Sequence, residues 1–119
     1  MDKTCIFCKI VAGKIKIDKI YENDNFISFP DANPAVEGHS LVIPKKHFKT
    51  FLDLPNTLGT EFLDCVKKTT LILMEKHKAE GFNLVSNNFP AAGQEVHHFH
   101  LHIIPRKEKD GRLLHLMKK

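Results

Sequence analysis

The chain has 119 residues, 42% hydrophobic and 27% charged, which is typical of one globular domain. No apolar run approaches the roughly 20 residues of a membrane-spanning helix, and the start of the chain lacks the apolar stretch of a secretory signal. Lysine and arginine exceed aspartate and glutamate by 18 to 14, but they are scattered rather than gathered in a basic stripe. We therefore expect a partner that is neither a membrane nor a nucleic acid.

The cysteines indicate the compartment. There are three, an odd number that does not make a disulfide framework and that suits a reducing environment. We therefore expect a cytoplasmic protein, with the nucleus as the alternative.

The first third of the chain predicts one short helix and three strands. Thr4 can cap a helix that Gly13 ends. Strands are expected on either side of the Asn-Asp-Asn turn at 23–25, and a third follows a loop that contains two prolines. These elements lie at 19–22, 26–29 and 40–43, with the loop at 30–38.

The rest of the chain predicts one long helix and two strands. Apolar residues recur every three to four positions from about Pro55 to Glu80, which indicates an amphipathic helix ended by Gly81. A loop separates the two strands. The strands are expected at 82–86 and 96–104 and the loop at 87–94. The pattern predicts an α+β fold in one domain, 1–119, with an antiparallel sheet of about five strands, a short N-terminal helix at 4–13, a core at 19–105 and a charged tail at 107–119.

Three histidines alternate along the last strand. Successive side chains of a strand point to opposite faces, so His98, His100 and His102 share one face, while the apolar residues between them point to the core. The outer two Cα atoms would lie about 13 Å apart, too far for one metal ion with bonds of about 2.1 Å. A phosphate centred on His100 fits this spacing better, and a neutral imidazole is a competent nucleophile toward phosphorus.

Several blocks of the chain resemble the histidine triad (HIT) family, and specifically its Hint branch. The segment His-Phe-His-Leu-His-Ile-Ile at 98–104 matches the pattern in which histidines alternate with apolar residues. The segments at 5–11, 38–47 and 92–96 are similar to Hint proteins in the same order. The likeness covers nearly the whole chain.

The resemblance implies a HIT fold and a nucleoside phosphoramidase or nucleotidyl hydrolase. By the family pattern, His100 takes the nucleoside monophosphoryl group as a covalent nucleotidyl-histidine, with His102 near the leaving group. His98 supports the site from the other side, and His39 joins the hydrogen-bond network of the triad. The family also implies a homodimer in which the sheet continues across the subunits and the long helix pairs with its copy.

The same resemblance implies a site for a purine nucleotide of the AMP type. The positions that match the surroundings of the base and ribose are Phe7, Phe29, Asp31 and Ala32, with Asp31 as the acceptor for ribose hydroxyls. The positions that match the phosphate side are Asn87, Gly93 and Gln94, where backbone N–H groups near a glycine can approach the ligand. The set is completed by Glu95, His100 and His102. Two departures are present. Glu95 replaces a serine that assists the leaving group in animal Hint proteins, and their C-terminal tryptophan is missing, since this chain has none.

Cys5 and Cys8 form a Cys-x-x-Cys pair that alone has three interpretations: half of a zinc site, a redox pair, or two buried residues at a helix start. Some relatives with this pair hold zinc with two further histidines, which here are His47 and His98. Two thiolates and two imidazoles make a closed, structural site. We expect no cofactor to be needed for catalysis itself.

Three other functions remain open. One is hydrolysis of dinucleoside polyphosphates, as in another branch of the family. A second is a regulatory module that binds a nucleotide with little turnover. A third is a redox or zinc-carrier role for the cysteine pair.

Overall fold

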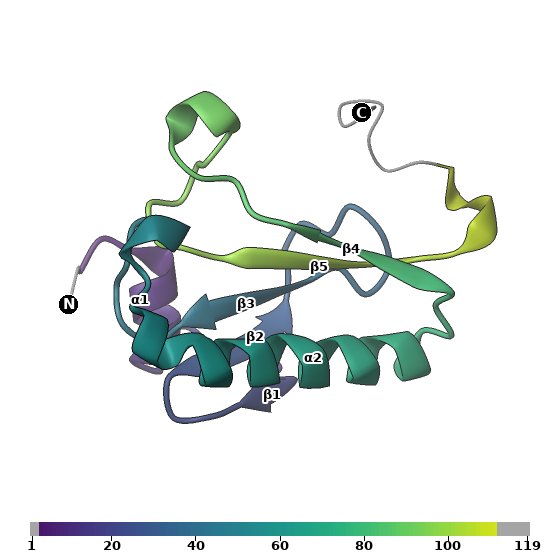
Figure 1. The fold of residues 1–119 in the computed structure, drawn as a ribbon, viewed down its shortest axis with the longest axis horizontal. Helices are drawn as coiled ribbons and strands as arrows, with labels where there is room; N and C mark the ends of the chain where they lie inside the picture. The colour runs from purple at the N-terminus through teal and green to yellow at the C-terminus, as the bar shows by residue number, and fades with distance from the viewer. Residues whose placement is uncertain (1–2, 112–119) are drawn as a thin grey trace.

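A computed structural model describes residues 3–111 of the chain. Its centre is a five-stranded antiparallel sheet in the order β1-β2-β3-β5-β4, which confirms the expected α+β fold (Figure 1). The strands are β1 (Tyr21–Glu22), β2 (Phe26–Pro30), β3 (Ser40–Pro44), β4 (Gly81–Val85) and β5 (Leu101–Arg106).

The two faces of the sheet bury different clusters because neighbouring residues of each strand point to opposite sides. On one face, Phe26 and Val42 pack with Ile103 and with the long helix α2 (Gly59–Lys76). On the other face, Ile27 and Ile43 pack with the short helix α1 (Ile6–Val11). The sheet is therefore covered by α2 along its length and by α1 at one end (Figure 1).

The long helix is shorter than the 55–80 that the periodicity predicts. A single 3-10 turn at Asn56–Leu58 precedes it, so Pro55 lies outside the helix. At the other end His77 is the C-cap, and Lys78 has a positive φ of 52° that ends the helix before Gly81, which instead begins β4. A left-handed residue is a usual way to end a helix, although glycine is the residue that normally supplies it.

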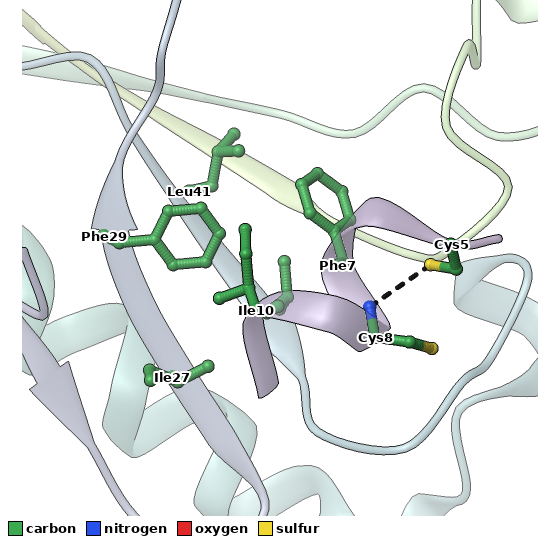
Figure 2. Packing of buried hydrophobic residues seen from close by; sticks show 8 residues of the cluster. Cys5, Phe7, Cys8, Ile10, Ile27, Phe29 and Leu41 are labelled. Atoms are coloured by element: carbon green, nitrogen blue, oxygen red, sulfur yellow. Dashed lines mark hydrogen bonds between the residues drawn. The ribbon is translucent and has the colours of Figure 1, made fainter. Parts of the chain in front are cut away.

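Cys5, and not Thr4, caps the first helix. The Sγ atom of Cys5 accepts a hydrogen bond from the Cys8 N–H at 3.4 Å. Figure 2 shows the Cys5 sulfur turned back toward the Cys8 N–H, whereas the Cys8 sulfur points away from Phe29 and Ile27. Both cysteines belong to the buried cluster that contains these apolar side chains. The start of α1 therefore contributes two buried thiols to this cluster.

The last strand begins at Leu101, five residues later than the predicted start at Val96. The segment before it still alternates, because the Phe99 N–H donates to the Phe48 carbonyl at 2.6 Å and the Phe99 ring packs against Phe62 of α2 at 5.8 Å. His98 and His100 therefore point to the opposite face, as the sequence predicts.

Residues 107–111 of the expected tail form an ordered turn. The Lys107 N–H donates to Asp110 Oδ2, and the Glu108 N–H donates to Glu80 Oε1, each at 2.8 Å. The remainder of the tail, 112–119, lies outside the described residues. Within residues 3–111, no helix is long and apolar enough to cross a membrane.

Candidate functional site

A cleft of about 700 Å³ opens on the α1 face of the sheet, within the size range of small-molecule sites. Every residue predicted to bind nucleotide lines it except Gln94, and His39 lines it as well. The predicted residues in the wall are Phe7, Phe29, Asp31, Ala32, Asn87, Gly93, Glu95, His100 and His102.

One wall of the cleft is apolar. Phe7 and Phe29 meet edge to face with their ring centroids 6.1 Å apart. Sequence reasoning missed further residues of the cleft, although the alternation Ile15-Lys16-Ile17 is a signal for a segment with one apolar side. These further lining residues are Ile6, Ile10, Ile15, Lys16, Ile17, Asp18, Pro30, Asn33, Leu41 and Val96. An apolar slot with a few polar groups suits a flat base.

The ring of His100 is fixed by the backbone of its own strand. Its Nδ1–H donates to the His98 carbonyl at 2.8 Å, and the ring packs edge to face on Phe7 at 5.0 Å. A carbonyl oxygen only accepts, so the proton of neutral His100 is on Nδ1. The lone pair is therefore on Nε2, the atom that a nucleophile requires.

A chain of hydrogen bonds also fixes the tautomers of His39 and His102. The Ala35 N–H donates to His39 Nδ1 at 2.9 Å, so neutral His39 carries its proton on Nε2. His39 Nε2 lies 2.8 Å from His102 Nδ1, which must then accept. The proton of neutral His102 is therefore on Nε2, the nitrogen away from His39.

The imidazoles of His39 and His100, which are buried, and that of His102, which is partly buried, are held neutral. Burial lowers the pKa of His102 to about 4, with a smaller contribution from neighbouring His100. Burial likewise lowers the pKa values of His100 and His39 below their usual 6.5. Desolvation disfavours the charged form of a histidine, so the unliganded site presents neutral rings near neutral pH.

Asp31 closes this network from the ribose side of the predicted site. Its Oδ2 lies 3.4 Å from His39 Nε2 and 3.8 Å from His102 Nδ1, and its Oδ1 accepts from the Asn33 N–H at 2.9 Å. These three side chains also have the ligand types of a metal site. The Ala35 hydrogen bond argues against that use, because it requires a proton on the very nitrogen of His39 that a metal would take.

A second cluster gathers the four predicted zinc ligands. His98 Nδ1 lies 3.4 Å from Cys5 Sγ, 3.6 Å from Cys8 Sγ and 3.1 Å from His47 Nδ1. Cys8 Sγ lies 3.2 Å from His47 Nδ1. Ligands around a tetrahedral zinc ion are separated by about 3.3 to 3.8 Å, given bonds of about 2.0 to 2.3 Å, so these four residues fit that ion.

The other ring nitrogen of His98 strengthens this fit. His98 Nε2–H donates to the Pro44 carbonyl at 2.9 Å, which leaves the lone pair on the nitrogen that faces the thiols. Metal-binding histidines usually have such an outer partner. His98 itself is fully buried and does not line the nucleotide cleft.

The predicted phosphate side of the cleft is built differently from expectation. The side chain of Gln94 is buried and holds the loop together: its Oε1 accepts from the Phe89 N–H, and its Nε2 donates to the Lys49 carbonyl. The backbone N–H groups of Gly93 and Gln94 donate within the turn, to the carbonyls of Pro90 and Phe89. They are therefore already satisfied, and the side chain of Asn87 in the cleft wall is the better placed donor.

Comparisons with known proteins identify the family of the chain. The HIT domain family model matches residues 12–109. Over 114 residues the chain is 35% identical to adenosine 5'-monophosphoramidase HNT1 of Saccharomyces cerevisiae, covering 96% of this chain and 70% of that protein. It is 39% identical over 110 residues to adenylylsulfatase HINT3 of Arabidopsis thaliana, covering 92% of this chain and 56% of the relative.

A solved structure shows the same fold. The crystal structure of SMU.412c from Streptococcus mutans UA159 superposes with a TM-score of 0.90 at 36% identity, covering all of this chain and 76% of that one. A family match over most of the chain, the shared fold and the alternating histidines in the cleft together establish that this protein belongs to the HIT domain family, whose members are nucleotide hydrolases or nucleotide-binding proteins.

Proposed function

We propose that the protein hydrolyses nucleoside 5'-phosphoramidates, adenosine forms above all, to an amine and a nucleoside monophosphate. The observation that carries this proposal is the Nδ1–H hydrogen bond from His100 to the His98 carbonyl. It leaves Nε2 of a neutral ring with its lone pair in a cleft of nucleotide size. The name of the yeast relative, an adenosine 5'-monophosphoramidase, supports the same chemistry.

The reaction proceeds in two displacements. His100 Nε2 attacks phosphorus, the P–N bond breaks, and the leaving nitrogen takes a proton from His102. Water then attacks the nucleotidyl-histidine and returns a proton to His102, while the His100–phosphorus bond breaks and the nucleoside monophosphate departs. The anionic phosphoryl group raises the pKa of His102 above its value in the free protein, so bound substrate favours the protonated form that the empty site disfavours. Protonated His102 carries a hydrogen on Nδ1 and no longer accepts from His39 there. Asp31 Oδ2, which lies 3.4 Å from His39 Nε2 and 3.8 Å from His102 Nδ1, is the acceptor for both N–H groups.

The charges of the cleft favour an amine over a polyphosphate as the leaving group. Three carboxylates, those of Asp18, Asp31 and Glu95, share the cleft with one lysine, Lys16, and with histidines held neutral. A polyphosphate or sulfate leaving group would add negative charge beside these carboxylates. Dinucleoside polyphosphate hydrolysis is therefore the weaker enzymatic alternative, whereas binding with little turnover is distinguished by assaying a phosphoramidate.

We propose that Cys5, Cys8, His47 and His98 hold a structural zinc ion. The support is the mutual spacing of their ligand atoms, all within 4.8 Å of one another, and the outer hydrogen bond of His98 to Pro44. Bound there, zinc would crosslink α1, the segment after β3 and the segment before β5. It takes no part in the displacement at phosphorus.

We further propose that the protein is a homodimer joined through β4 and α2. β4 is an edge strand, and its Phe82 and Leu84 are 46% and 45% exposed. On α2, Leu63 and Leu71 are 53% and 68% exposed. Pairing of two β4 strands would continue the sheet and cover this apolar surface, and natural proteins seldom leave such edges open.

The first prediction concerns the covalent step. Two displacements give net retention of configuration at phosphorus, so a chiral adenosine thiophosphoramidate should yield product with retained configuration. His100→Ala should lose nearly all turnover yet still bind AMP, whereas His102→Ala should lose about 10²- to 10⁴-fold with alkylamine substrates. Phosphorus NMR of the product in labelled water measures the configuration, and inversion would show that water attacks directly.

The second prediction concerns pH. The p-nitrophenyl ester of AMP has a leaving group that needs no proton, so its kcat/KM follows the neutral form of His100. Because burial lowers the pKa of His100 below 6.5, the midpoint of the acidic limb of this profile should lie below pH 6.5. An acidic limb centred above pH 6.5 would contradict the assignment.

The third prediction concerns Glu95 and the charge of the leaving group. Adenosine phosphoramidates of pentylamine, 1,5-diaminopentane and 5-aminopentanoate differ only in the charge of the far end. The kcat/KM should rise from the anionic to the neutral to the cationic member by about two- to fivefold for each unit of charge. Glu95→Gln should flatten this series, whereas Glu75→Gln, the same change on an exposed site of α2, should leave it intact.

The fourth prediction concerns the metal. Protein grown with zinc should contain about one ion per chain, and chelation should lower the midpoint of thermal unfolding, because metal binding is coupled to folding. Cys8→Ser should lower the zinc content measured by elemental analysis, while Cys65→Ser, a buried cysteine of α2, should retain it. Zinc-free wild-type protein would refute the site.

The fifth prediction concerns assembly. Analytical ultracentrifugation at micromolar concentration should give the mass of a dimer. Leu84→Lys places a charge on the edge strand and should give monomers, whereas Leu52→Lys, at an exposed site outside β4 and α2, should remain dimeric. A monomeric wild type would exclude this interface.

A further inference from the structure

The loop at 31–38 carries the groups that orient two of the site histidines. Asp31 lies at its start, and Ala35 in its middle donates to His39 Nδ1. Most of the loop is exposed, and its described backbone hydrogen bonds are local: the Asp31 N–H donates to the His39 carbonyl and the His39 N–H to the Val36 carbonyl. These bonds shape the loop, but they do not attach it to the helix layer beneath.

The ring of His77 makes that attachment at Gly38. Gly38 has a φ of +89°, and a Cβ placed on it would lie 2.7 Å from His77 Cδ2 and 3.0 Å from Nε2. The imidazole therefore sits directly against the backbone one residue before His39. Glycine is required here twice, for its backbone conformation and for the absent side chain.

His77 itself is firmly placed. It is the C-cap of α2, and its N–H donates to the Leu73 carbonyl at 3.0 Å. Its side chain is 17% exposed and lines two cavities, of about 130 and 450 Å³. Removing the ring would therefore enlarge the space on this side of the loop and leave the backbone at Gly38 without its contact with the C-cap of α2.

We propose that His77 is a positioning residue, whose ring holds the 31–38 loop so that the Ala35 N–H sets the tautomers of His39 and His102. His77 lines neither the nucleotide cleft nor the thiol cluster, and it acts through Gly38 and the loop. The inference rests on the proposed function in one respect, the role of His102 as the proton donor to the leaving group. The effect of His77 on the tautomers does not depend on any reaction.

The packing of the ring, and not its charge, carries this role. The only charged partner of His77 among the described residues is Glu37, with Nδ1 3.5 Å from Oε2. The Glu37 side chain is 82% exposed, and exposed ion pairs contribute little. A phenyl ring at position 77 would keep the contact with Gly38 and lose only this ion pair.

The decisive experiment compares His77→Ala with His77→Phe in the full chain. Long-range proton–nitrogen NMR of histidine rings reports which nitrogen carries the proton. Wild type and His77→Phe should show His39 and His102 protonated on Nε2, whereas His77→Ala should show mixed tautomers for both. Unchanged tautomers in folded His77→Ala, or mixed tautomers in His77→Phe, would overturn the proposal.

Kinetics provide a second readout that a merely structural role would not move. In His77→Ala, kcat for an alkylamine phosphoramidate should fall about 10- to 100-fold, the size of a misplacement near 1 Å. The p-nitrophenyl ester of AMP, which needs no proton from His102, should lose much less. Equal losses for both substrates would mean that His77 only stabilises the fold.

A double-mutant cycle tests the contact itself. Gly38→Ala alone should impair alkylamine turnover because its Cβ meets the His77 ring. Combined with His77→Ala, it should cost less than the product of the two single losses, since the methyl group enters the space that the ring vacates. Gly13→Ala is the matched control, because Gly13 has a φ of +77° with nothing within 4 Å of the added Cβ. The loss in the Gly13→Ala, His77→Ala double variant should equal the product of the two single losses.

The outcomes separate this inference from the proposed function. If no phosphoramidate is cleaved but His77→Ala still scrambles the tautomers, the proposed reaction fails and the positioning role survives. If wild type cleaves phosphoramidates, but His77→Ala changes neither the tautomers nor the ratio of the rates for the two substrates, only the positioning role fails.

Discussion

The hydrogen bond from His100 Nδ1–H to the His98 carbonyl links the nucleotide cleft to the thiol cluster, because His100 lines the first and His98 belongs to the second. It lies within one backbone segment, so it needs no partner from elsewhere in the chain, and it fixes which nitrogen of His100 is free. The same residue that supplies the carbonyl, His98, has its ring fixed by Pro44 and by the thiols of α1. Whatever holds the His98 ring therefore also holds the acceptor of His100.

Strand alternation makes this arrangement compatible with a stable fold. On the α2 face, Phe99 and Ile103 are fully buried in an apolar layer. On the opposite face, His98 and His100 are buried and His102 is partly buried, but each has a hydrogen-bond partner. Among the described residues, no buried side-chain nitrogen or oxygen lacks one. Burial of an unpaired polar group would lower the free energy of unfolding by about 1 to 3 kcal/mol. Because these groups are paired, the polar site does not carry that cost.

The sequence predicts the fold class and the face shared by the three histidines because both follow from local patterns. These patterns are the alternation of side chains along a strand and the repeat of apolar residues every three to four positions in a helix. The sequence misplaces the start of β5, since pairing at His98–His100 depends on the segment after β3 rather than on residue type. The family resemblance matches Gln94 to the phosphate side through its backbone, but in the structure the Gln94 N–H donates to the Phe89 carbonyl and the side chain closes its own loop. The Ala35 donor has no signal in the sequence, because any residue but proline supplies the same backbone N–H.

The distribution of charge gives the neutral histidines a further meaning. A cleft for a phosphoryl group is commonly expected to be positive, yet this one holds three carboxylates and one lysine in a chain of net charge +4. Desolvation keeps the imidazoles of His100 and His102 uncharged in the free site. In the proposed reaction, the positive charge near the phosphoryl group arises only when the bound anion favours protonation of His102. For the proposed reaction, a phosphoramidate brings one negative phosphoryl group beside an amine, and these charges suit the carboxylates of the cleft better than those of a polyphosphate.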